Sequence, residues 1–369
     1  MSTFVLMAGG TGGHLFPAMA LAQELRRRGH VIQLMTDHRV GDYGKGFPAR
    51  EIHVVPAATL SIGNPVKFIL AAFKILWGTA VAWSKLREIK PDAVVGFGGY
   101  PTFPPFLAAS LAGVPGILHE QNAVMGRANR ALGRFARVIA LSFERTARAE
   151  PFENKSLLTG NPVRDQVKSI AGQPFPELTA GGPVHVLIFG GSQGARAFAD
   201  LMPPAIAELP SEMRSRLRVT QQCRPEDLDR VAEAYRRAKV NVELAAFFDD
   251  LPERMAQSHL VIARSGASSV AELCVIGRPA ILIPLPGSLD ADQRNNALVI
   301  EAAGGGWIAE QATLSPLSLG TRLASLLSEP EALQRAAAAA KSLGQPLAVE
   351  KLAEIAEQLA LRNEGTRSR

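Results

Sequence analysis

The stretch FVLMAGGTGGH, residues 4–14, joins a short apolar run to a glycine-rich loop. A helix is predicted to follow through Leu25, with Pro17 near its start and Gly29 as its C-cap. A buried strand, a glycine loop and a helix in this order are typical of a Rossmann-like α/β domain. We therefore expect the chain to open with such a domain.

The same pattern restarts in the second half of the chain. Val184–Phe189 is predicted as a strand, the loop GGSQGAR (190–196) follows it, and a helix comes next. Two such openings predict two Rossmann-like domains. We place their boundary near NPVR (161–164), so that residues 1–163 form the first domain and residues 164–346 the second.

Most of the predicted strands are continuous apolar runs, as expected for parallel sheets covered on both faces. In the first domain the strands are predicted at 4–7, 31–36, 52–55, 93–95, 116–119 and 138–141. In the second they are predicted at 184–189, 217–220, 242–244, 260–263 and 280–283. Residues 347–362 carry apolar side chains at helical spacing, and the tail GTRSR (365–369) is expected to be disordered.

The composition favours a globular protein with anionic partners. Of 369 residues, 47% are hydrophobic and 20% are charged, which is enough for an ordinary core. The net charge of +6 favours nucleic acid, acidic lipid or a phosphorylated substrate, and ordinary solubility is the alternative. The two cysteines, Cys223 and Cys274, exclude a disulfide framework and fit a reducing cytosol.

Neither a signal peptide nor a membrane span is expected. The N-terminus lacks a basic segment followed by a long apolar one. The longest apolar run, Phe68–Trp83, is interrupted by Lys74 and Gly78, and it is shorter than the ~20 residues that a spanning helix needs.

Three glycine loops, at 9–14, 96–100 and 190–195, are candidate ligand sites. The first and third lie between a strand and a helix, where the helix N-terminus offers free N–H groups to an anion. A dinucleotide site is a competing interpretation, with Asp37 as the ribose acid, but Leu15 occupies the place of the last glycine of that motif. No P-loop is present, and loops without any ligand remain an alternative.

Eight motifs, in order along the chain, resemble those of the MurG family of N-acetylglucosaminyltransferases. They are GGTGGHLFPA (9–18), GFGGYPTFPP (96–105), HEQNAVMGRANR (119–130), GNPVR (160–164), GGSQGARAF (190–198), FFDDL (247–251), RSGASSVAEL (264–273) and DQRNNA (292–297). The resemblance implies a GT-B fold, in which two Rossmann-like domains face a cleft and the C-terminal helix (347–362) packs back on the first domain. It implies an inverting transfer of N-acetylglucosamine from UDP to the C4 hydroxyl of undecaprenyl-diphosphate-linked N-acetylmuramyl-pentapeptide, in peptidoglycan synthesis.

The resemblance also implies that the second domain binds the donor. Ser192 would meet the UDP diphosphate together with the N-terminus of the following helix, a position that the helix dipole favours as well. The fixed charge of Arg164 can face a phosphate. Ala267 and Ser268, where a strand gives way to a helix, are implied to join this site.

Three further donor contacts are implied. Glu272 would accept hydrogen bonds from both ribose hydroxyls; the alternative is a capping acid, because Glu272 is predicted in the first helical turn. Phe248 would flank the uracil through its backbone. Gln293 would bind the sugar hydroxyls, since an amide offers both a donor and an acceptor.

The first domain is implied to bind the acceptor. It is also implied to close over the sugar of the donor, UDP-N-acetylglucosamine, with Thr11, Gly12 and Gly13, and with Asn122 beside them. The residues implied at the acceptor diphosphate are Gly98, Gly99 and Tyr100.

His14 and Glu120 are the candidate bases for the acceptor hydroxyl. Histidine needs little pKa tuning for this task, and the helix start would lower the pKa of His14 and keep its ring neutral. His14 could instead donate a hydrogen bond to phosphate or be a structural loop residue. Glu120 could equally belong to an internal network, so the base stays open at this point.

No cofactor and no essential metal are expected. Asp290-Ala291-Asp292 matches the metal-binding DxD pattern of another glycosyltransferase class. Two acidic residues at this spacing often arise by chance, and a helix N-terminus already neutralises a leaving UDP.

The segment VKFILAAFKILWGTAVAWSKLRE (66–88) mixes apolar and basic residues. One helical face, with Ile69, Phe73, Leu76, Ala80 and Trp83, could be core, but Phe68, Leu70, Ile75, Trp77 and Val81 lie elsewhere and remain to be covered. Together with Arg127, Arg130, Arg134 and Arg137, this segment could bind an anionic leaflet. The alternative is a helical hairpin with a covered core and a solvated basic rim.

The expected partners are UDP-N-acetylglucosamine, the lipid-linked muramyl-pentapeptide, an anionic membrane surface and other cell-wall synthesis proteins, but no nucleic acid. The expected location is the cytoplasmic face of the inner membrane, with peripheral attachment. The competing functions are a relative with another acceptor, a UDP-N-acetylglucosamine epimerase, a dinucleotide oxidoreductase and a nucleotide-sensing module without catalysis.

Overall fold

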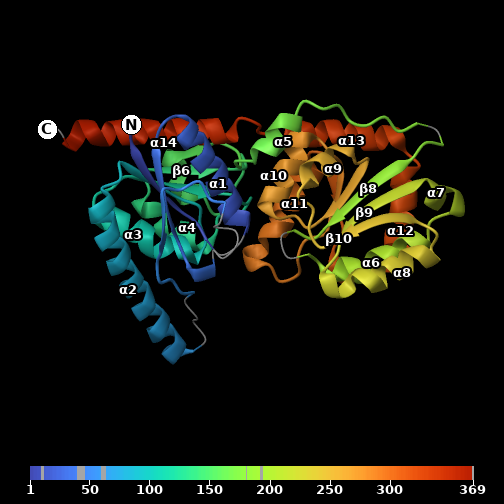
Figure 1. The fold of residues 1–369 in the computed structure, drawn as a ribbon, viewed down its shortest axis with the longest axis horizontal. Coiled ribbons are helices and arrows are strands. Elements are labelled where there is room, and N and C mark those ends of the chain that lie inside the picture. Colours follow the sequence, from blue (N-terminus) through green and yellow to red (C-terminus); the bar gives the residue numbers. More distant parts are fainter. Residues whose placement is uncertain (10–11, 40–45, 60–63, 180, 192–193, 368–369) are drawn as a thin grey trace. The chain divides into compact units, whose positions relative to one another are not determined.

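The computed structural model describes residues 1–9, 12–39, 46–59, 64–179, 181–191 and 194–367 (Figure 1). Its contacts divide the chain into two units. Unit 1 comprises Met1–Arg164 and Pro346–Arg369, and unit 2 comprises Asp165–Gln345. Unit 2 is therefore inserted in the sequence of unit 1, and Arg164 belongs to unit 1 by its contacts.

Unit 1 is built on a parallel sheet of seven strands in the order β3-β2-β1-β4-β5-β6-β7. The strands are β1 (Thr3–Met7), β2 (Val31–Thr36), β3 (Glu51–Val54), β4 (Ala93–Gly96), β5 (Gly116–Glu120), β6 (Val138–Leu141) and β7 (Ser156–Leu158). The strand order reverses between β1 and β4, and ligands of open α/β sheets bind beyond the carboxyl ends of the strands at such a point.

Helices cover both faces of this sheet (Figure 1). Alternate side chains of β1 divide between the two faces, because successive residues of a strand point to opposite sides. Phe4 and Leu6 pack with α1 (Gly12–Arg27) and α14 (Ala348–Arg367). Val5 and Met7 pack with the helices of the other face. Those helices are α2 (Pro65–Ile89), α3 (Phe103–Leu111) and α4 (Arg127–Leu132).

Helix α1 follows the glycine loop as predicted, with one correction. Pro17 lies inside the helix rather than near its start, and it is buried. Gly29 adopts a φ of 83°, and its N–H donates to the carbonyl oxygen of Arg26 over 2.9 Å. A residue with positive φ just beyond the last turn is a common way to end a helix.

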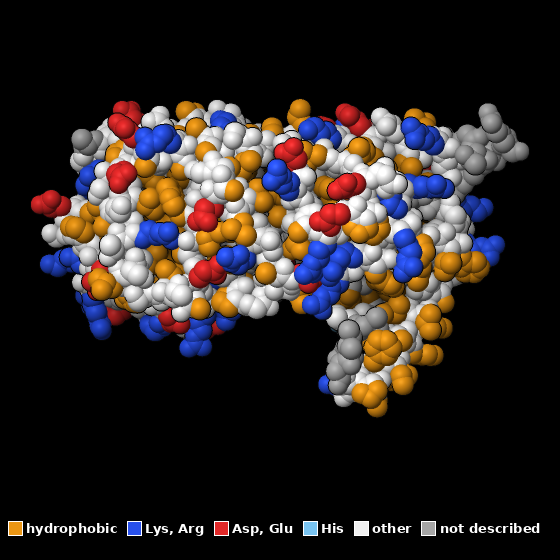
Figure 2. Space-filling view, turned by 180° about the vertical axis from the view of Figure 1, so that it is seen from behind, with side chains coloured by type: hydrophobic (Ala, Val, Ile, Leu, Met, Phe, Trp, Pro, Cys, Tyr) orange, Lys and Arg blue, Asp and Glu red, His pale blue; other side chains and the backbone are white. Residues whose placement is uncertain are grey.

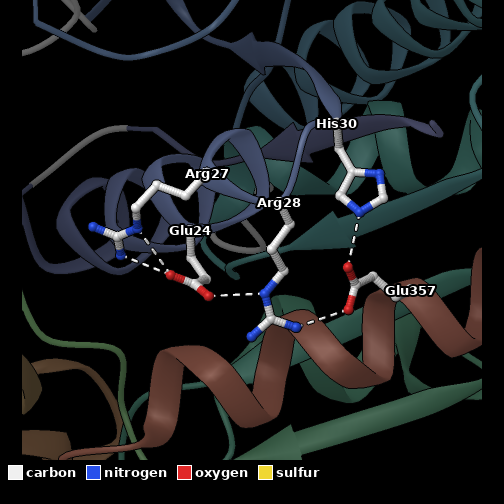
Figure 3. Close-up of polar contacts among 5 residues, drawn as sticks. All are labelled: Glu24, Arg27, Arg28, His30 and Glu357. Carbon is white, nitrogen blue, oxygen red and sulfur yellow. Dashed lines mark hydrogen bonds and ion pairs between the residues drawn. The ribbon is translucent and has the colours of Figure 1, made fainter.

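Helix α14 is held on unit 1 by apolar packing and by a polar cluster. Val349, Leu352 and Ala356 are buried against the sheet side that α1 covers. The Glu357 carboxylate accepts from the Arg28 guanidinium over 2.7 Å and from His30 Nε2 over 2.8 Å, the two contacts drawn to it in Figure 3. The helix continues to Arg367, so the prediction of a disordered tail is wrong for its first residues, 365–367.

Helix α2 contradicts two interpretations that the sequence left open, the hairpin and the buried face. It is one helix of 25 residues rather than a hairpin, and by length and composition alone it could cross a membrane. The face that could have been core is exposed, with Phe73 70% and Leu76 67% accessible. Its buried residues are instead Ala71, Gly78, Thr79, Ala82 and Leu86. A Cβ on Gly78 would overlap the carbonyl oxygen of Pro56, so close packing uses this narrow side.

The apolar side chains of α2 thus form an exposed surface, which Figure 2 shows along the part of the helix that extends past the sheet. We call this set the α2 apolar surface. Its members are Val66, Phe68, Ile69, Leu70, Phe73, Leu76, Trp77 and Trp83.

Unit 2 repeats the topology, with a parallel sheet in the order β10-β9-β8-β11-β12-β13. Its strands are β8 (Val184–Phe189), β9 (Leu217–Gln222), β10 (Asn241–Ala245), β11 (Leu260–Ala263), β12 (Ala280–Leu282) and β13 (Gly306–Ile308). Its helices are α5 (Asp165–Ile170), α6 (Arg196–Ala207), α7 (Ser211–Arg216), α8 (Leu228–Arg237), α9 (Leu251–Gln257), α10 (Ala267–Ile276), α11 (Asp292–Ala302), α12 (Pro316–Leu327) and α13 (Pro330–Ser342). Side chains of β8, β9 and β11 form one core with α6, α8 and α12.

Candidate active site

The carboxyl ends of β1, β4 and β5 bring together three of the predicted motifs in unit 1. Gly98 and Gly99 have φ values of 78° and 71°, a region that favours glycine. A Cβ on Gly99 would lie 3.2 Å from Nε2 of His14, and a Cβ on Gly98 would lie 3.1 Å from the side-chain nitrogen of Asn129. The two glycines therefore allow the loop after β4 to lie directly against His14 and Asn129.

Thr102 fixes this loop and was missed from the sequence. Its hydroxyl lies 2.6 Å from the carbonyl oxygen of Gly98 and 3.0 Å from that of Met7, and it is fully buried. The side chain thus ties the loop after β4 to the end of β1. A threonine shortly before a helix is too common to be recognised as such a tie.

His14, on the first turn of α1, is connected to the end of β5. Its Nδ1 lies 3.2 Å from Oε1 of Gln121. The amide nitrogen of Gln121 lies 2.9 Å from the carbonyl oxygen of Phe97 and 3.0 Å from Nδ1 of His119. Nε2 of His119 in turn lies 3.0 Å from the carbonyl oxygen of Gly160. Burial lowers the pKa of His119 to about 4, so this ring is neutral at physiological pH.

Glu120 is enclosed by its own loop. Oε1 accepts from the backbone N–H of Asn122 over 3.0 Å and from its side chain over 3.3 Å. Oε2 accepts from the backbone N–H of Gly126 over 2.9 Å and from the side chain of Asn129 over 2.8 Å. Burial raises the pKa of Glu120, and these donors oppose that shift because they favour the carboxylate. The arrangement favours an internal network over a catalytic base.

Tyr100 points to Asp37 at the end of β2. Its hydroxyl donates to Asp37 over 2.9 Å, and the Arg39 guanidinium donates to the same oxygen over 2.8 Å while lying 4.6 Å from the Tyr100 ring centre. Burial alone would raise the pKa of Asp37, but the bonds from Arg39 and Tyr100 outweigh it and hold this pKa below its usual range. Asp37 is therefore engaged within the protein, which argues against its role as the ribose acid of a dinucleotide site.

In unit 2, β11 ends at the N-terminus of α10. Ala267 is the first residue of the helix, and Ser268 follows it. The hydroxyls of Ser265, which is fully buried, and of Ser268 have no hydrogen-bond partner among the described residues. The first N–H groups of a helix also lack intrahelical acceptors. This end of α10 can therefore accommodate an anion that accepts hydrogen bonds.

Glu272 lies on α10 but not where it was predicted. It is the sixth residue of the helix, in the second turn, and it is buried. The alternative interpretation of Glu272 as a first-turn capping acid is therefore wrong, because the helix begins at Ala267. A carboxylate in the second turn gains little from the helix dipole.

Two other residues predicted to contact the UDP-sugar donor stabilise loops of unit 2. Oε1 of Gln293, at the start of α11, accepts from the backbone N–H of Leu285 over 3.0 Å. Phe248 is buried just before α9, and the Arg254 guanidinium lies 4.4 Å from its ring centre. Both side chains thus fix the segments on which they lie.

Arg264, at the end of β11, was not predicted as a site residue. Its guanidinium donates to the carbonyl oxygens of Ile283 and Pro284, each over 3.0 Å, and to the side chain of Gln311 over 2.6 Å. Arg264 therefore ties the end of β11 to the segment after β12. An arginine directly after a buried apolar run was the available signal, because such a charge must be paired.

Several predicted residues lie apart from these contacts. Thr11 and Ser192 lie outside the described residues. Gly12 and Gly13 are the first residues of α1. The Arg164 guanidinium lies 5.4 Å from the ring centre of Phe16 in unit 1.

Among the described residues, no group of three or more His, Cys, Asp and Glu side chains is arranged to hold a metal ion. Asp292 of the DxD pattern accepts from the backbone N–H of Gln293 over 2.7 Å. The independence from a metal stays a prediction. Cys223 and Cys274 are free and buried, and burial raises the pKa of the Cys274 thiol to about 12.

Comparison with known proteins defines the class first. The models of the N-terminal and C-terminal domains of glycosyltransferase family 28 match residues 4–141 and 185–359. Fold and matches together define a glycosyltransferase of the GT-B type.

The UDP-N-acetylglucosamine–N-acetylmuramyl-(pentapeptide) pyrophosphoryl-undecaprenol N-acetylglucosamine transferase of Agrobacterium fabrum is 48% identical over 356 residues, covering 96% of this chain and 94% of the relative. A crystal structure of Acinetobacter baumannii MurG matches with a TM-score of 0.81 at 30% identity, covering 97% of this chain and 100% of that one. The chain belongs to this N-acetylglucosaminyltransferase family, the MurG family.

The comparisons also separate family from fold. A UDP-GlcNAc 2-epimerase from Neisseria meningitidis, solved with UDP-GlcNAc bound, has a TM-score of 0.65 at 15% identity, covering 95% of this chain and 98% of that one. At this identity the likeness concerns the fold alone. The predicted fold, family and transferase activity are thus confirmed, and the epimerase and oxidoreductase alternatives are set aside.

Proposed function

We propose that unit 1 carries the acceptor and the proton transfer of the family reaction, and that unit 2 carries the donor. As a member of this family, the chain transfers N-acetylglucosamine from its UDP carrier to the lipid-linked N-acetylmuramyl-pentapeptide of peptidoglycan synthesis. The observation that carries the division is chemical. At the carboxyl ends of its strands, unit 1 holds titratable side chains that are hydrogen-bonded to one another. At the same ends of its strands, unit 2 offers hydroxyls without a described partner, next to a helix N-terminus.

In this proposal His14 is the general base. Both oxygens of Glu120 already accept hydrogen bonds from the loop 122–129, whereas Nε2 of His14 faces the open glycine backbone at Gly99. As the acceptor C4 oxygen bonds to the anomeric carbon, its proton passes to Nε2 of His14 and the bond from the anomeric carbon to UDP breaks. A single displacement of this kind inverts the configuration.

Unit 2 would stabilise the leaving UDP. The diphosphate would lie at the N-terminus of α10 and accept from the backbone of Ala267 and the hydroxyls of Ser265 and Ser268. Glu272 would accept from the ribose hydroxyls. Gln293 would bind the sugar, and the backbone of Phe248 would flank the uracil. Ser192 and Arg164 remain predicted phosphate contacts, and Gly98, Gly99 and Tyr100 remain predicted contacts of the acceptor diphosphate.

Two variants test this division in a UDP-release assay with UDP-N-acetylglucosamine and the lipid-linked acceptor. His14→Ala is expected to lower kcat by about 10²- to 10⁴-fold with little change in the donor KM, because a general base acts in the transition state. Glu272→Ala is expected to raise the donor KM by roughly 100-fold, since two hydrogen bonds to a charged group are lost. Near-native kcat in His14→Ala, with the melting temperature unchanged, would remove His14 as the base.

We further propose that the α2 apolar surface attaches the protein peripherally to the cytoplasmic face of the inner membrane. Eight large apolar side chains are exposed on one helix of unit 1, and Lys67 and Lys74 lie among them. An exposed apolar patch flanked by cations suits an anionic leaflet, where the lipid-linked acceptor is found. Attachment to cell-wall synthesis proteins stays a prediction.

Vesicle sedimentation tests this attachment. The protein is expected to bind phosphatidylglycerol vesicles at low salt and to leave them at high salt. Replacing Phe73 and Leu76 together by glutamate should weaken binding at least about ten-fold, because each side chain gains roughly 1.5–3 kcal/mol on burial. Leu317→Glu, at a 64% exposed leucine of unit 2, is the matched control. Resistance to salt extraction would instead indicate a spanning helix.

A further inference from the structure

The amide of Gln121 has a single allowed orientation. Gln121 is 2% exposed, and one end of its amide lies 2.9 Å from the carbonyl oxygen of Phe97 and 3.2 Å from that of His119. Carbonyl oxygens only accept hydrogen bonds, so this end must be the NH₂ group. The other end, which faces His14, is therefore the carbonyl oxygen Oε1.

This orientation determines the protonation of the His14 ring. An amide oxygen only accepts, so Nδ1 of His14, 3.2 Å away, must carry the hydrogen. In a neutral imidazole the other nitrogen then holds the lone pair. That nitrogen is Nε2, which faces Gly99, where the missing side chain leaves room beside it.

The hydrogen bonds from Gln121 to His119 and from His119 to Gly160 continue in the same donor-to-acceptor direction. Nδ1 of His119 lies 3.0 Å from the Gln121 NH₂ group and accepts from it, so Nε2–H of His119 donates to the carbonyl oxygen of Gly160 over 3.0 Å. His119 is fully buried and neutral, since burial lowers its pKa to about 4. The bonds run in one direction from His14 to Gln121 and from Gln121 to His119, and reversing one of them would set two donors or two acceptors against each other.

We propose that Gln121 is the positioning residue that fixes His14 in its Nδ1–H tautomer, so that Nε2 receives the proton of the acceptor hydroxyl. This inference rests on the proposed role of His14 as base. When Nε2 takes the proton, the bond from Nδ1–H to Oε1 persists and becomes charge-assisted. The amide cannot accept that proton, so the proton stays on His14 until it leaves through Nε2. The titratable groups that interact with His14 are His119 and Glu120 of β5.

Nitrogen-15 NMR of the histidine rings tests the tautomer without any turnover. The full-length wild-type protein is expected to show His14 with Nδ1 protonated and Nε2 unprotonated, the His14 signals being those lost in His14→Ala. Gln121→Met removes the acceptor at similar size, and its His14 signals should become those of two exchanging tautomers. We expect kcat to fall at least about ten-fold with an unchanged donor KM, because an unheld ring loses both its tautomer and its orientation.

Gln121→Glu is the matched variant, because it places an oxygen toward His14 in either protonation state. It should keep the Nδ1–H tautomer and retain more kcat than Gln121→Met. A native His14 tautomer in Gln121→Met would overturn the inference. An equal loss of kcat in both variants, while Gln121→Glu keeps the native tautomer, would overturn it as well. The base and its positioning fail separately: an active His14→Ala removes the base, whereas the NMR result decides the tautomer.

Discussion

The polar side chains at the carboxyl ends of the two sheets differ, although the strands run in the same order. In unit 1, His14, Gln121 and His119 bond to one another, and Glu120 accepts four hydrogen bonds. In unit 2, the hydroxyls of Ser265 and Ser268 have no partner among the described residues. The contrast is one of degree, because Asn161 of unit 1 is also buried without a described partner.

This difference suits the two tasks of a transferase. A proton acceptor must be held in one orientation before the substrate arrives, so protein groups satisfy it in advance. In a site for a leaving phosphate the donors stay unpaired until the ligand binds. Each unpaired buried donor costs about 1–3 kcal/mol, and this free energy is regained when the phosphate accepts its hydrogen bond. One topology therefore supports a bonded site in unit 1 and an open one in unit 2.

The largest effect is expected at Glu120. Glu120→Ala leaves the half-buried donors of Asn122 and Gly126 and the buried side chain of Asn129 without their acceptor. We expect the free energy of unfolding to fall by roughly 3–5 kcal/mol, as when one partner is removed from a buried charged group. Activity should fall with it, while UDP affinity, measured by titration calorimetry, stays unchanged. Loss of kcat at wild-type stability would show that Glu120 acts in the chemistry instead.

Two serine variants, one in each unit, test the same difference between the two sites, with smaller expected effects than Glu120→Ala. Ser268→Ala removes an open hydroxyl, so the donor KM should rise about 2- to 10-fold, the value of one hydrogen bond, with stability unchanged. Ser142→Ala removes a hydroxyl that donates to the carbonyl oxygen of Glu120 over 2.8 Å, so it should lower stability and leave the donor KM alone. The reverse pattern in urea unfolding and steady-state kinetics would break the comparison.

The smallest effect concerns the polar cluster that holds α14. Burial alone would raise the pKa of Glu357, but the bonds from His30 and Arg28 outweigh it and lower that pKa. A lowered folded-state pKa means that the contribution to stability is present above the unfolded value, about 4.3, and is lost as the pH falls through the folded value.

Glu357→Gln should therefore melt below the wild type at pH 6, by an amount equivalent to at most about 1 kcal/mol, and the gap should close toward pH 3. Glu354→Gln, at an exposed site on the same helix, is the control. A gap that does not change with pH would mean that the charge of Glu357 contributes nothing.

The parts that could be predicted from the sequence are those with local signals. The strand–glycine–helix openings and the buried runs predicted both sheets, whereas β7 and β13 were missed. Neither is a buried apolar run: Leu157 and Leu158 of β7 are exposed, and Gly306 is the one buried residue of β13. The α2 apolar surface was misjudged in part, since periodicity shows a face but not what covers it. Glu272 was placed one turn too early because helix starts are uncertain by a few residues.

The network around His14 could not be predicted. Gln121 lies 107 residues from His14 in sequence, and its role depends on which end of an amide faces which carbonyl oxygen. Neither residue type nor spacing carries that information. The candidate base was visible in the sequence, but the group that orients it became visible only in three dimensions.

The insertion of unit 2 in the sequence of unit 1 has a consequence for biosynthesis. A chain made from its N-terminus presents the whole of Asp165–Gln345 before Ala348 leaves the ribosome, and domains generally fold as units during synthesis. Until then, the side of the first sheet that carries Phe4 and Leu6 lacks the cover of Val349, Leu352 and Ala356. The half of the protein that is translated first is therefore the last to be completed. A nascent chain stalled before α14 should expose this apolar face to chaperones while unit 2 is already folded.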